Sequence, residues 1–231
     1  MSTEGAVLNG GGGGFAARGH NGDGARCAKS PPGRETIEAA ADLLSHLWSR
    51  PLPAEVEIWA EAGAFLAETH RLVSSEPACE PVELAGGAVD SSELLDEYER
   101  LFVGPGQVPC PPYESFWRED VPVDIRRTLM GPCTAELKEL YRELGLQVSA
   151  SSCELPDHVA IELEALAYSL SSDEMGAVAS RLFGEHLARF LPRFCRAVAH
   201  DAESSFYRDL AALTLDWMAG IRAYFSVAES G

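Results

Sequence analysis

Four ionisable side chains within residues 154–162 have types and spacings that could do chemistry. Glu154, Asp157 and His158 surround Pro156, and Glu162 follows His158 after four positions. Proline favours the first turn of a helix, so we predict that Asp157 and His158 lie on a first turn, with His158 and Glu162 on one face. This cluster is a candidate metal site, a candidate catalytic pair or part of a binding surface.

The metal site and the catalytic pair would each need further residues that the sequence does not place beside this cluster. A metal held by Glu154, His158 and Glu162 would need ligands from another helix, and no second His-x-x-x-Glu or Glu-x-x-His spacing occurs. A His–Asp pair would need a nucleophile, and only folding could bring Ser115 or Cys110 to it. We therefore expect no metal, no cofactor and no enzymatic activity, and an acidic histidine cluster that is structural or binds a partner.

The second unusual segment is a long loop at residues 104–120. Its prolines and glycines exclude a regular helix through residues 105–112. They are followed by Tyr113, Glu114, Ser115, Phe116 and Trp117. Long ordered loops in compact domains are often functional, and aromatic side chains favour order over disorder. The loop is therefore predicted to be a rigid recognition surface, although Tyr113 and Trp117 could instead fasten it to the core.

Composition limits the partners. The formal net charge of −18 disfavours binding to nucleic acid and to anionic membranes, and it favours a cationic partner. The alternative is that the charge serves only solubility, or is an adaptation of the host's whole proteome. The six cysteines contain no Cys-x-x-Cys pair. No secretory signal and no run of about 18 apolar residues occurs, so we expect a cytoplasmic protein without stable membrane insertion.

The apolar pattern predicts an all-α protein. Residues 1–34 are rich in glycine and are expected to form a disordered tail. Residues 35–228 show helical periodicity and are expected to form one single-domain bundle of about seven helices, interrupted by the long Pro-rich loop. Predicted helix ends lie at Gly104 and Gly145.

Three short motifs together resemble the TorD/DmsD/NarJ family of redox-enzyme maturation chaperones. They are Tyr-Glu-Arg-Leu-Phe-Val-Gly-Pro-Gly at 98–106, Pro-Pro-Tyr-Glu-Ser at 111–115, and Glu-Leu-Pro-Asp-His at 154–158 with Glu162 and Leu163 following. Their order and separations are similar to those of family members over residues 36–226. Trp117 departs from the tyrosine that relatives often have, and residues 1–33 have no counterpart.

The resemblance implies an all-helical, non-enzymatic chaperone of the cytoplasm. It would bind the twin-arginine signal peptide and apoprotein of a molybdopterin-dependent oxidoreductase and assist cofactor insertion before export. The residues that it marks as peptide-binding are Tyr113, Glu114, Ser115, Trp117, Glu154, Asp157, His158 and Glu162. His158 could instead anchor the loop through one hydrogen bond.

Two alternatives accompany this interpretation. One is an assembly factor that binds the mature part of a nitrate-reductase-like enzyme rather than its leader. The other, nucleotide binding, is disfavoured because the chain lacks a Gly-x-x-x-x-Gly-Lys-Ser/Thr loop. The expected oligomeric state is a monomer or a helix-exchanged dimer.

Overall fold

The computed structural model describes residues 6–8, 33–52, 91–122, 124–125, 128–149 and 154–228. These residues are mostly helical, so the predicted all-α class is confirmed. The α-helices are α1 (Arg34–Leu47), α3 (Ser91–Tyr98), α4 (Glu114–Trp117), α5 (Pro132–Glu143), α6 (Val159–Leu170), α7 (Gly176–Arg181), α8 (Ala188–Asp201) and α9 (Ser205–Ala228). The π-helical segments are η1 (Glu99–Val103) and η3 (Leu182–Leu187), η2 (Asp173–Met175) is a 3-10 helix, and the strands are β1 (Ala6–Leu8) and β2 (Leu146–Val148).

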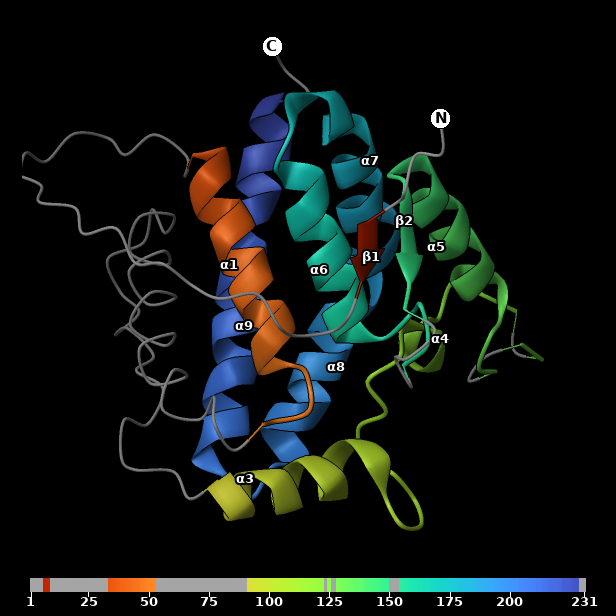
Figure 1. Ribbon diagram of the computed structural model, residues 1–231. Helices are drawn as coiled ribbons and strands as arrows, with labels where there is room; N and C mark the ends of the chain where they lie inside the picture. The colour runs from red at the N-terminus through yellow and green to blue at the C-terminus, as the bar shows by residue number, and fades with distance from the viewer. Residues whose placement is uncertain are drawn as a thin grey trace, which may run out of the picture.

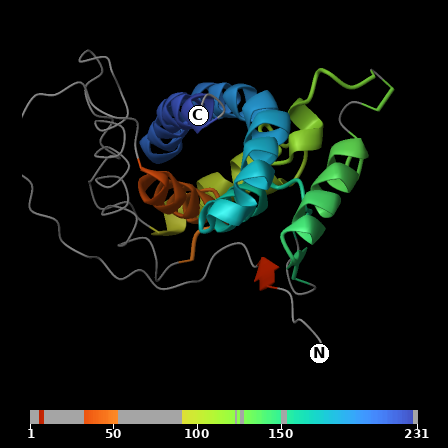
Figure 2. The same ribbon diagram turned by 90° about the horizontal axis from the view of Figure 1, so that it is seen from above.

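The long helices run side by side as a bundle (Figure 1), and its end-on view is shown in Figure 2. Helix α1 packs against α6 and α9, and α8 packs against α9. Helix α3 crosses one end of the bundle, and α5 lies beside the bundle (Figure 1). Because α6 is buried along most of its length, its first residues are held firmly between the neighbouring elements.

Backbone-restricting residues set the ends of several helices. Segment η1 stops at Gly104, whose φ is 103°, and Gly145 follows α5 with a φ of 70°. Both values favour glycine because a side chain at positive φ is strained. The predicted ends at these two glycines are confirmed. Pro132 occupies the start of α5, where its missing N–H costs nothing.

Aromatic rings connect the crossing segment to the bundle. Phe102 of η1 lies 6.1 Å from Trp48 and 5.4 Å from Tyr207, measured between ring centroids. Trp48 in turn lies 4.9 Å from Phe194 of α8. These contacts join segments far apart in the sequence into one core, and the loop after Gly104 therefore starts from a fixed point.

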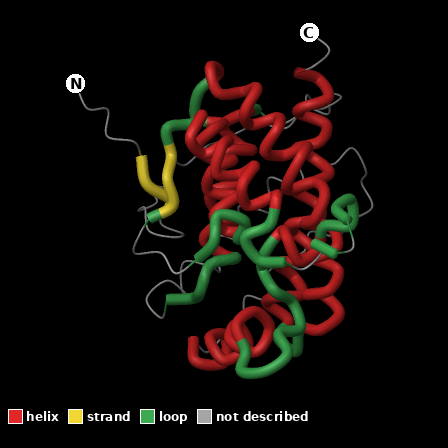
Figure 3. The backbone as a smooth tube through the Cα atoms, turned by 90° about the vertical axis from the view of Figure 1, so that its right-hand side faces the viewer, coloured by secondary structure: helices red, strands yellow, loops and turns green. Residues whose placement is uncertain are grey.

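A short pair of strands was not predicted. Strand β1 pairs in parallel with β2, with Ala6 opposite Leu146 and Leu8 opposite Val148. Figure 3 shows the two strands beside the helices. Three residues are too few for an alternating pattern to be seen in the sequence. Strand β1 falls within the segment predicted as a tail, whose other residues up to 32 lie outside the described residues.

None of the described helices combines the length and the apolar character that a membrane crossing requires.

Candidate functional site

The two segments singled out in the sequence meet at the start of α6. The Glu114 N–H donates to the Asp157 carbonyl at 2.8 Å, and the Val159 N–H donates to the Pro112 carbonyl at 2.9 Å. Tyr113 and His158 form an antiparallel bridge between these bonds. The predicted two-part site is thus one continuous backbone unit, in which the prolines before Tyr113 hold an extended chain against the helix start.

His158 caps α6 rather than lying on its first turn. Its Nδ1 accepts a hydrogen bond of 3.1 Å from the Ala160 N–H. The ring is buried and lies 5.4 Å from the Tyr113 ring in an edge-to-face arrangement. Burial lowers the pKa of His158, although Glu154 opposes this effect. The predicted position on the first turn is wrong by one residue for His158 and by two for Asp157, because α6 begins at Val159. The hydrogen bond of the His158 ring goes to its own helix, and the ring meets the loop through its contact with Tyr113.

Tyr113 and Glu154 form a partly exposed pair over His158. The Tyr113 hydroxyl donates to Glu154 Oε2 at 3.0 Å, and His158 Nε2 lies 3.6 Å from the same oxygen. About a third of the Glu154 side chain is exposed, at 34%. Burial, with the charge of Glu154, raises the pKa of Tyr113. A carboxylate and an aromatic ring are therefore presented together to solvent.

Glu114 is fully buried between the Arg118 guanidinium and the His186 imidazole. One carboxylate oxygen binds the Arg118 guanidinium, which lies one helical turn further on. The other oxygen lies 2.9 Å from Nδ1 of His186, which is also buried. His186 belongs to η3, and such π-helical turns occur frequently at functional sites. Glu114 thus joins the loop to a distant helix through its contact with His186, while its ion pair with Arg118 lies within the loop.

Arg118 fixes the end of α4. Its guanidinium also binds Asp120 and donates to the Glu185 carbonyl at 3.2 Å. Arg189 of α8 reaches the same Asp120 carboxylate at 2.8 Å. Although burial opposes the change, the hydrogen bonds to Asp120 and Glu114 raise the pKa of Arg118. The guanidinium therefore stays charged and holds the loop on η3 and α8.

Trp117 is half-buried and fastens the loop to the core. Its Nε1–H donates to the Pro111 carbonyl at 2.7 Å, and its ring lies 6.0 Å from the Phe194 ring. Part of Trp117 remains accessible to solvent, since the residue is only partly buried. Trp117 consequently stabilises the conformation of the loop and still exposes some apolar surface.

Several buried polar atoms at this junction have no hydrogen-bond partner among the described residues. They are Ser115 Oγ, Asp157 Oδ1, His158 Nε2 and both carboxyl oxygens of Glu162. The other Asp157 oxygen accepts from the Ser115 N–H at 3.3 Å. Burial, followed by the nearby charges of Glu114 and Asp157, raises the pKa of Glu162 well above its ordinary value. Burial therefore favours the protonated form of the Glu162 carboxyl group.

The eight residues predicted to bind a peptide divide by exposure. Tyr113, Trp117 and Glu154 are partly exposed, whereas Glu114, Ser115, Asp157, His158 and Glu162 are buried. A bound peptide can touch only the first three directly in this structure. The other five support the backbone beneath them.

Sequence reasoning did not select Arg118 or His186. Arg118 follows Glu114 at helical i+4 spacing, which is a usable signal for an ion pair. His186 gives no such signal, because its neighbours Leu182, Phe183 and Leu187 form an ordinary apolar stripe. Its partner is 72 positions away, and only folding identifies it.

The chemical alternatives gain no support from this geometry. Across the described ranges, no group of three or more His, Cys, Asp or Glu side chains is placed to hold a metal ion. The Cys110 sulfur lies 3.8 Å from an Asp201 oxygen, and burial raises the pKa of its thiol to about 12. Ser115 Oγ, the other considered nucleophile, is buried without a base bonded to it.

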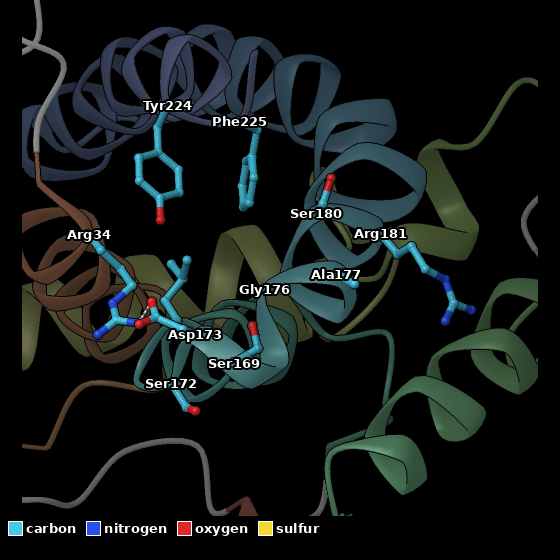
Figure 4. A pocket seen from close by; sticks show the side chains of 11 residues that line it. Arg34, Ser169, Ser172, Asp173, Gly176, Ala177, Ser180, Arg181, Tyr224 and Phe225 are labelled. Carbon is cyan, nitrogen blue, oxygen red and sulfur yellow. Dashed lines mark hydrogen bonds and ion pairs between the residues drawn. The ribbon is translucent and has the colours of Figure 1, made fainter. Parts of the chain in front are cut away.

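A separate cavity of about 540 Å³ lies at the other end of α6. In Figure 4, Tyr224 and Phe225 of α9 point into it, opposite Arg34 and Asp173, which form an ion pair. Its volume suits a small molecule. None of the eight predicted residues lines it, and α6, with 12 residues, places it about 18 Å from His158.

Comparison with known proteins supplies the family context. A family model described as "Nitrate reductase delta subunit" matches residues 55–196. "Tat proofreading chaperone DmsD" of Salmonella typhi is 29% identical over 194 residues, covering 82% of each chain. "Chaperone protein TorD" of Shewanella pealeana is 28% identical over 194 residues, covering 76% of this chain and 83% of its own.

One solved structure also matches. It is described as a candidate redox enzyme maturation protein from Archaeoglobus fulgidus, with a TM-score of 0.46 and 24% identity, and the match covers 82% of this chain and 93% of that one. The named relatives are chaperones rather than enzymes, in agreement with the expectation that this chain has no catalytic activity.

Proposed function

The chain belongs to the nitrate reductase delta subunit family, and we propose that it is a chaperone for the maturation of a redox enzyme. Its client is a molybdopterin-dependent oxidoreductase, whose twin-arginine leader and apoprotein it binds in the cytoplasm until the cofactor has been inserted. The relatives named as DmsD and TorD chaperones support the general role. The leader-binding step rests on the geometry at the start of α6.

The observation that carries this step is the partly exposed pair of Tyr113 and Glu154. A guanidinium binds a carboxylate through parallel hydrogen bonds and stacks on an aromatic face. Glu154 offers the carboxylate, and Tyr113 lies within hydrogen-bond distance of it, at 3.0 Å. Trp117 adds apolar surface nearby on the same loop. A leader with two arginines before an apolar stretch matches this combination.

The buried residues keep the contact residues in place. Asp157 and Val159 hold the loop backbone through hydrogen bonds, and Glu114 ties it to η3 through His186. A rigid site binds more tightly because little conformational entropy is lost when the partner arrives. The five buried members of the predicted set are therefore positioning residues in this proposal.

Overall charge acts in the same direction. The formal net charge of −18 speeds the encounter with a basic leader, and this effect weakens as salt is added. Specific recognition of arginine would remain at high salt, because bidentate hydrogen bonds depend on geometry as well as charge.

The test is titration calorimetry with a twin-arginine leader peptide and with its Lys-Lys variant, at low and high salt. We expect binding of the arginine peptide in the micromolar range and binding of the lysine peptide weaker by roughly tenfold. Absence of binding by both peptides at tens of micromolar would refute leader recognition. Equal binding of the arginine and lysine peptides would show that the leader is attracted by charge alone, without specific recognition of the guanidinium groups.

A second candidate function is binding to the mature part of a nitrate-reductase-like enzyme. The description of the matching family model favours it. Pull-down of the apoenzyme with and without its leader separates the two: retention of the leaderless apoenzyme by the chain, with no affinity for the isolated leader, would establish the second function.

A further inference from the structure

The parallel pair of β1 and β2 shows that the edge of β2 accepts an extended segment. Ala6, Val7 and Leu8 lie opposite Leu146, Gln147 and Val148, so every residue of β2 is matched. Strand β1 also contacts α6. It therefore lies against both β2 and α6, at the side of the bundle seen in Figures 1 and 3, and we call this position along the β2 edge the slot.

The slot itself belongs to the folded domain. Strand β2 follows α5 directly through Gly145, whose φ of 70° turns the chain, and β2 packs against α5. Leu146 is buried, whereas Gln147 is exposed and uncharged. The receiving edge is thus fixed in place, while its surface carries no charge that would repel an apolar segment.

The occupying strand is held weakly. A pair of three-residue strands is marginal in water, and parallel pairing is slightly weaker per residue than antiparallel pairing. Strand β1 stays near the slot because residues 9–33 connect it to α1, which gives it an effective concentration on the order of millimolar. A tethered strand of this kind can be displaced by a competitor with more contacts.

We propose that the edge of β2 is a strand-addition site for the extended apolar part of the client's leader, and that Ala6–Leu8 is its tethered competitor. This inference rests on the proposed function. Strand addition is a general mode of peptide recognition, in which backbone hydrogen bonds supply the affinity. Ala-Val-Leu has the apolar character of the leader stretch that it would mimic.

The slot is close enough to the proposed arginine site for one leader to use both. Val148 precedes Glu154 by six positions, so the chain between them spans at most about 20 Å. A leader whose guanidinium binds Glu154 can reach the β2 edge with a segment of similar length. Release of β1 would then be coupled to the arrival of the client.

The experiment compares the full chain, a variant lacking residues 1–9, and a Val7→Cys/Gln147→Cys variant. Neighbouring strands lie about 4.8 Å apart, which is within the Cα spacing of a disulfide.

The native cysteines must not compete with the engineered pair, so Cys27, Cys79 and Cys153 are replaced by Ser in all three proteins. Cys110, Cys133 and Cys195 are buried and remain, since burial raises the pKa of each thiol.

A fluorescein-labelled twin-arginine leader is the probe, and its anisotropy reports the affinity. We expect the truncated chain to bind it roughly 3- to 10-fold more tightly than the full chain. The oxidised cysteine variant should bind more weakly than the full chain, and a reductant should restore the affinity. Equal affinities for the full and truncated chains, together with no effect of oxidation, would overturn the competition.

A peptide copying residues 3–10 separates this inference from the proposed function. It should bind the truncated chain and not the oxidised variant, and the leader should displace it. If this peptide does not bind and the disulfide does not form, the slot is refuted while leader binding by the full chain stands. If the leader binds none of the proteins, both the competition and the proposed function are refuted, even where the peptide binds.

Discussion

Glu114 and His186 are separated by 72 positions, and their carboxylate oxygen and imidazole nitrogen lie 2.9 Å apart in the protein interior. The other Glu114 oxygen binds Arg118 of the same loop. This arrangement links the recognition loop to η3 at its base. It explains why a glutamate at the centre of the predicted binding motif is itself inaccessible to a partner.

Glu154→Gln should weaken leader binding by roughly 5- to 10-fold, because the amide cannot replace a charged carboxylate in a guanidinium pair. Tyr113→Phe should have a smaller effect, since the ring remains while its hydroxyl bond to Glu154 is lost. Calorimetry with the leader peptide measures both. The matched control is Glu174→Gln, an exposed residue of η2, and equal losses for Glu154→Gln and this control would show that only net charge matters.

Glu114→Ala should lower the free energy of unfolding by roughly 3 kcal/mol, because it removes the buried carboxylate that bridges the Arg118 guanidinium and the His186 ring, although Asp120 still binds Arg118. Urea denaturation followed by circular dichroism measures the change. Glu139→Gln, which removes an exposed ion pair to Arg142, should change it by less than about 0.5 kcal/mol. Comparable small losses for both variants would contradict a buried ion pair at Glu114.

The stability of the Glu162→Gln variant, relative to that of the parent protein, should increase as pH rises. The pKa of Glu162 is raised in the folded protein, so the stabilisation by its protonated form is complete below the unfolded value of 4.5 and is lost as pH rises through the folded value. Glutamine does not titrate and fills the same volume. The variant's free energy of unfolding should therefore gain steadily on that of the parent between pH 5 and pH 8. Glu136→Gln on the exposed face of α5 should show no such trend, and a flat difference for Glu162→Gln would refute the protonated state.

Thr214→Val should destabilise the contact between α1 and α9. The Trp48 Nε1–H donates to Thr214 Oγ1 at 3.0 Å, and both side chains are buried. Valine has nearly the same shape but no acceptor, so the buried indole N–H loses its partner at a cost of roughly 1–2 kcal/mol. Thermal and urea unfolding measure this loss. Thr214→Ser keeps the hydroxyl, and it should retain most of the hydrogen-bond contribution if the acceptor is the cause.

Local chemistry predicted much of the helical framework. The ends at Gly104 and Gly145 follow from glycine's freedom at positive φ, and the start of α6 follows Pro156 closely. His158 was misplaced by one residue because a histidine N-cap resembles a first-turn residue in sequence. Strand β1 was missed because its partner, β2, is remote along the chain and is equally short.

The sequence singled out the two motifs, and folding brings them together at Tyr113 and His158. Which side chains reach solvent was not predictable. Glu114 and Glu154 are the same residue type in comparable motifs, yet one is fully buried and the other is partly exposed. His186 could not be selected because its ring sits within an apolar stripe.

The sequence by itself determined the helical class, the proline-rich interruption and the two motifs, since each depends on backbone restrictions and side-chain types within a few residues. Only the tertiary structure decided that Glu114 supports the site while Tyr113 and Glu154 present it, and that β1 covers the edge of β2. The reason is physical. Exposure and pairing depend on which distant segments pack against a residue, and that packing is a property of the whole folded chain.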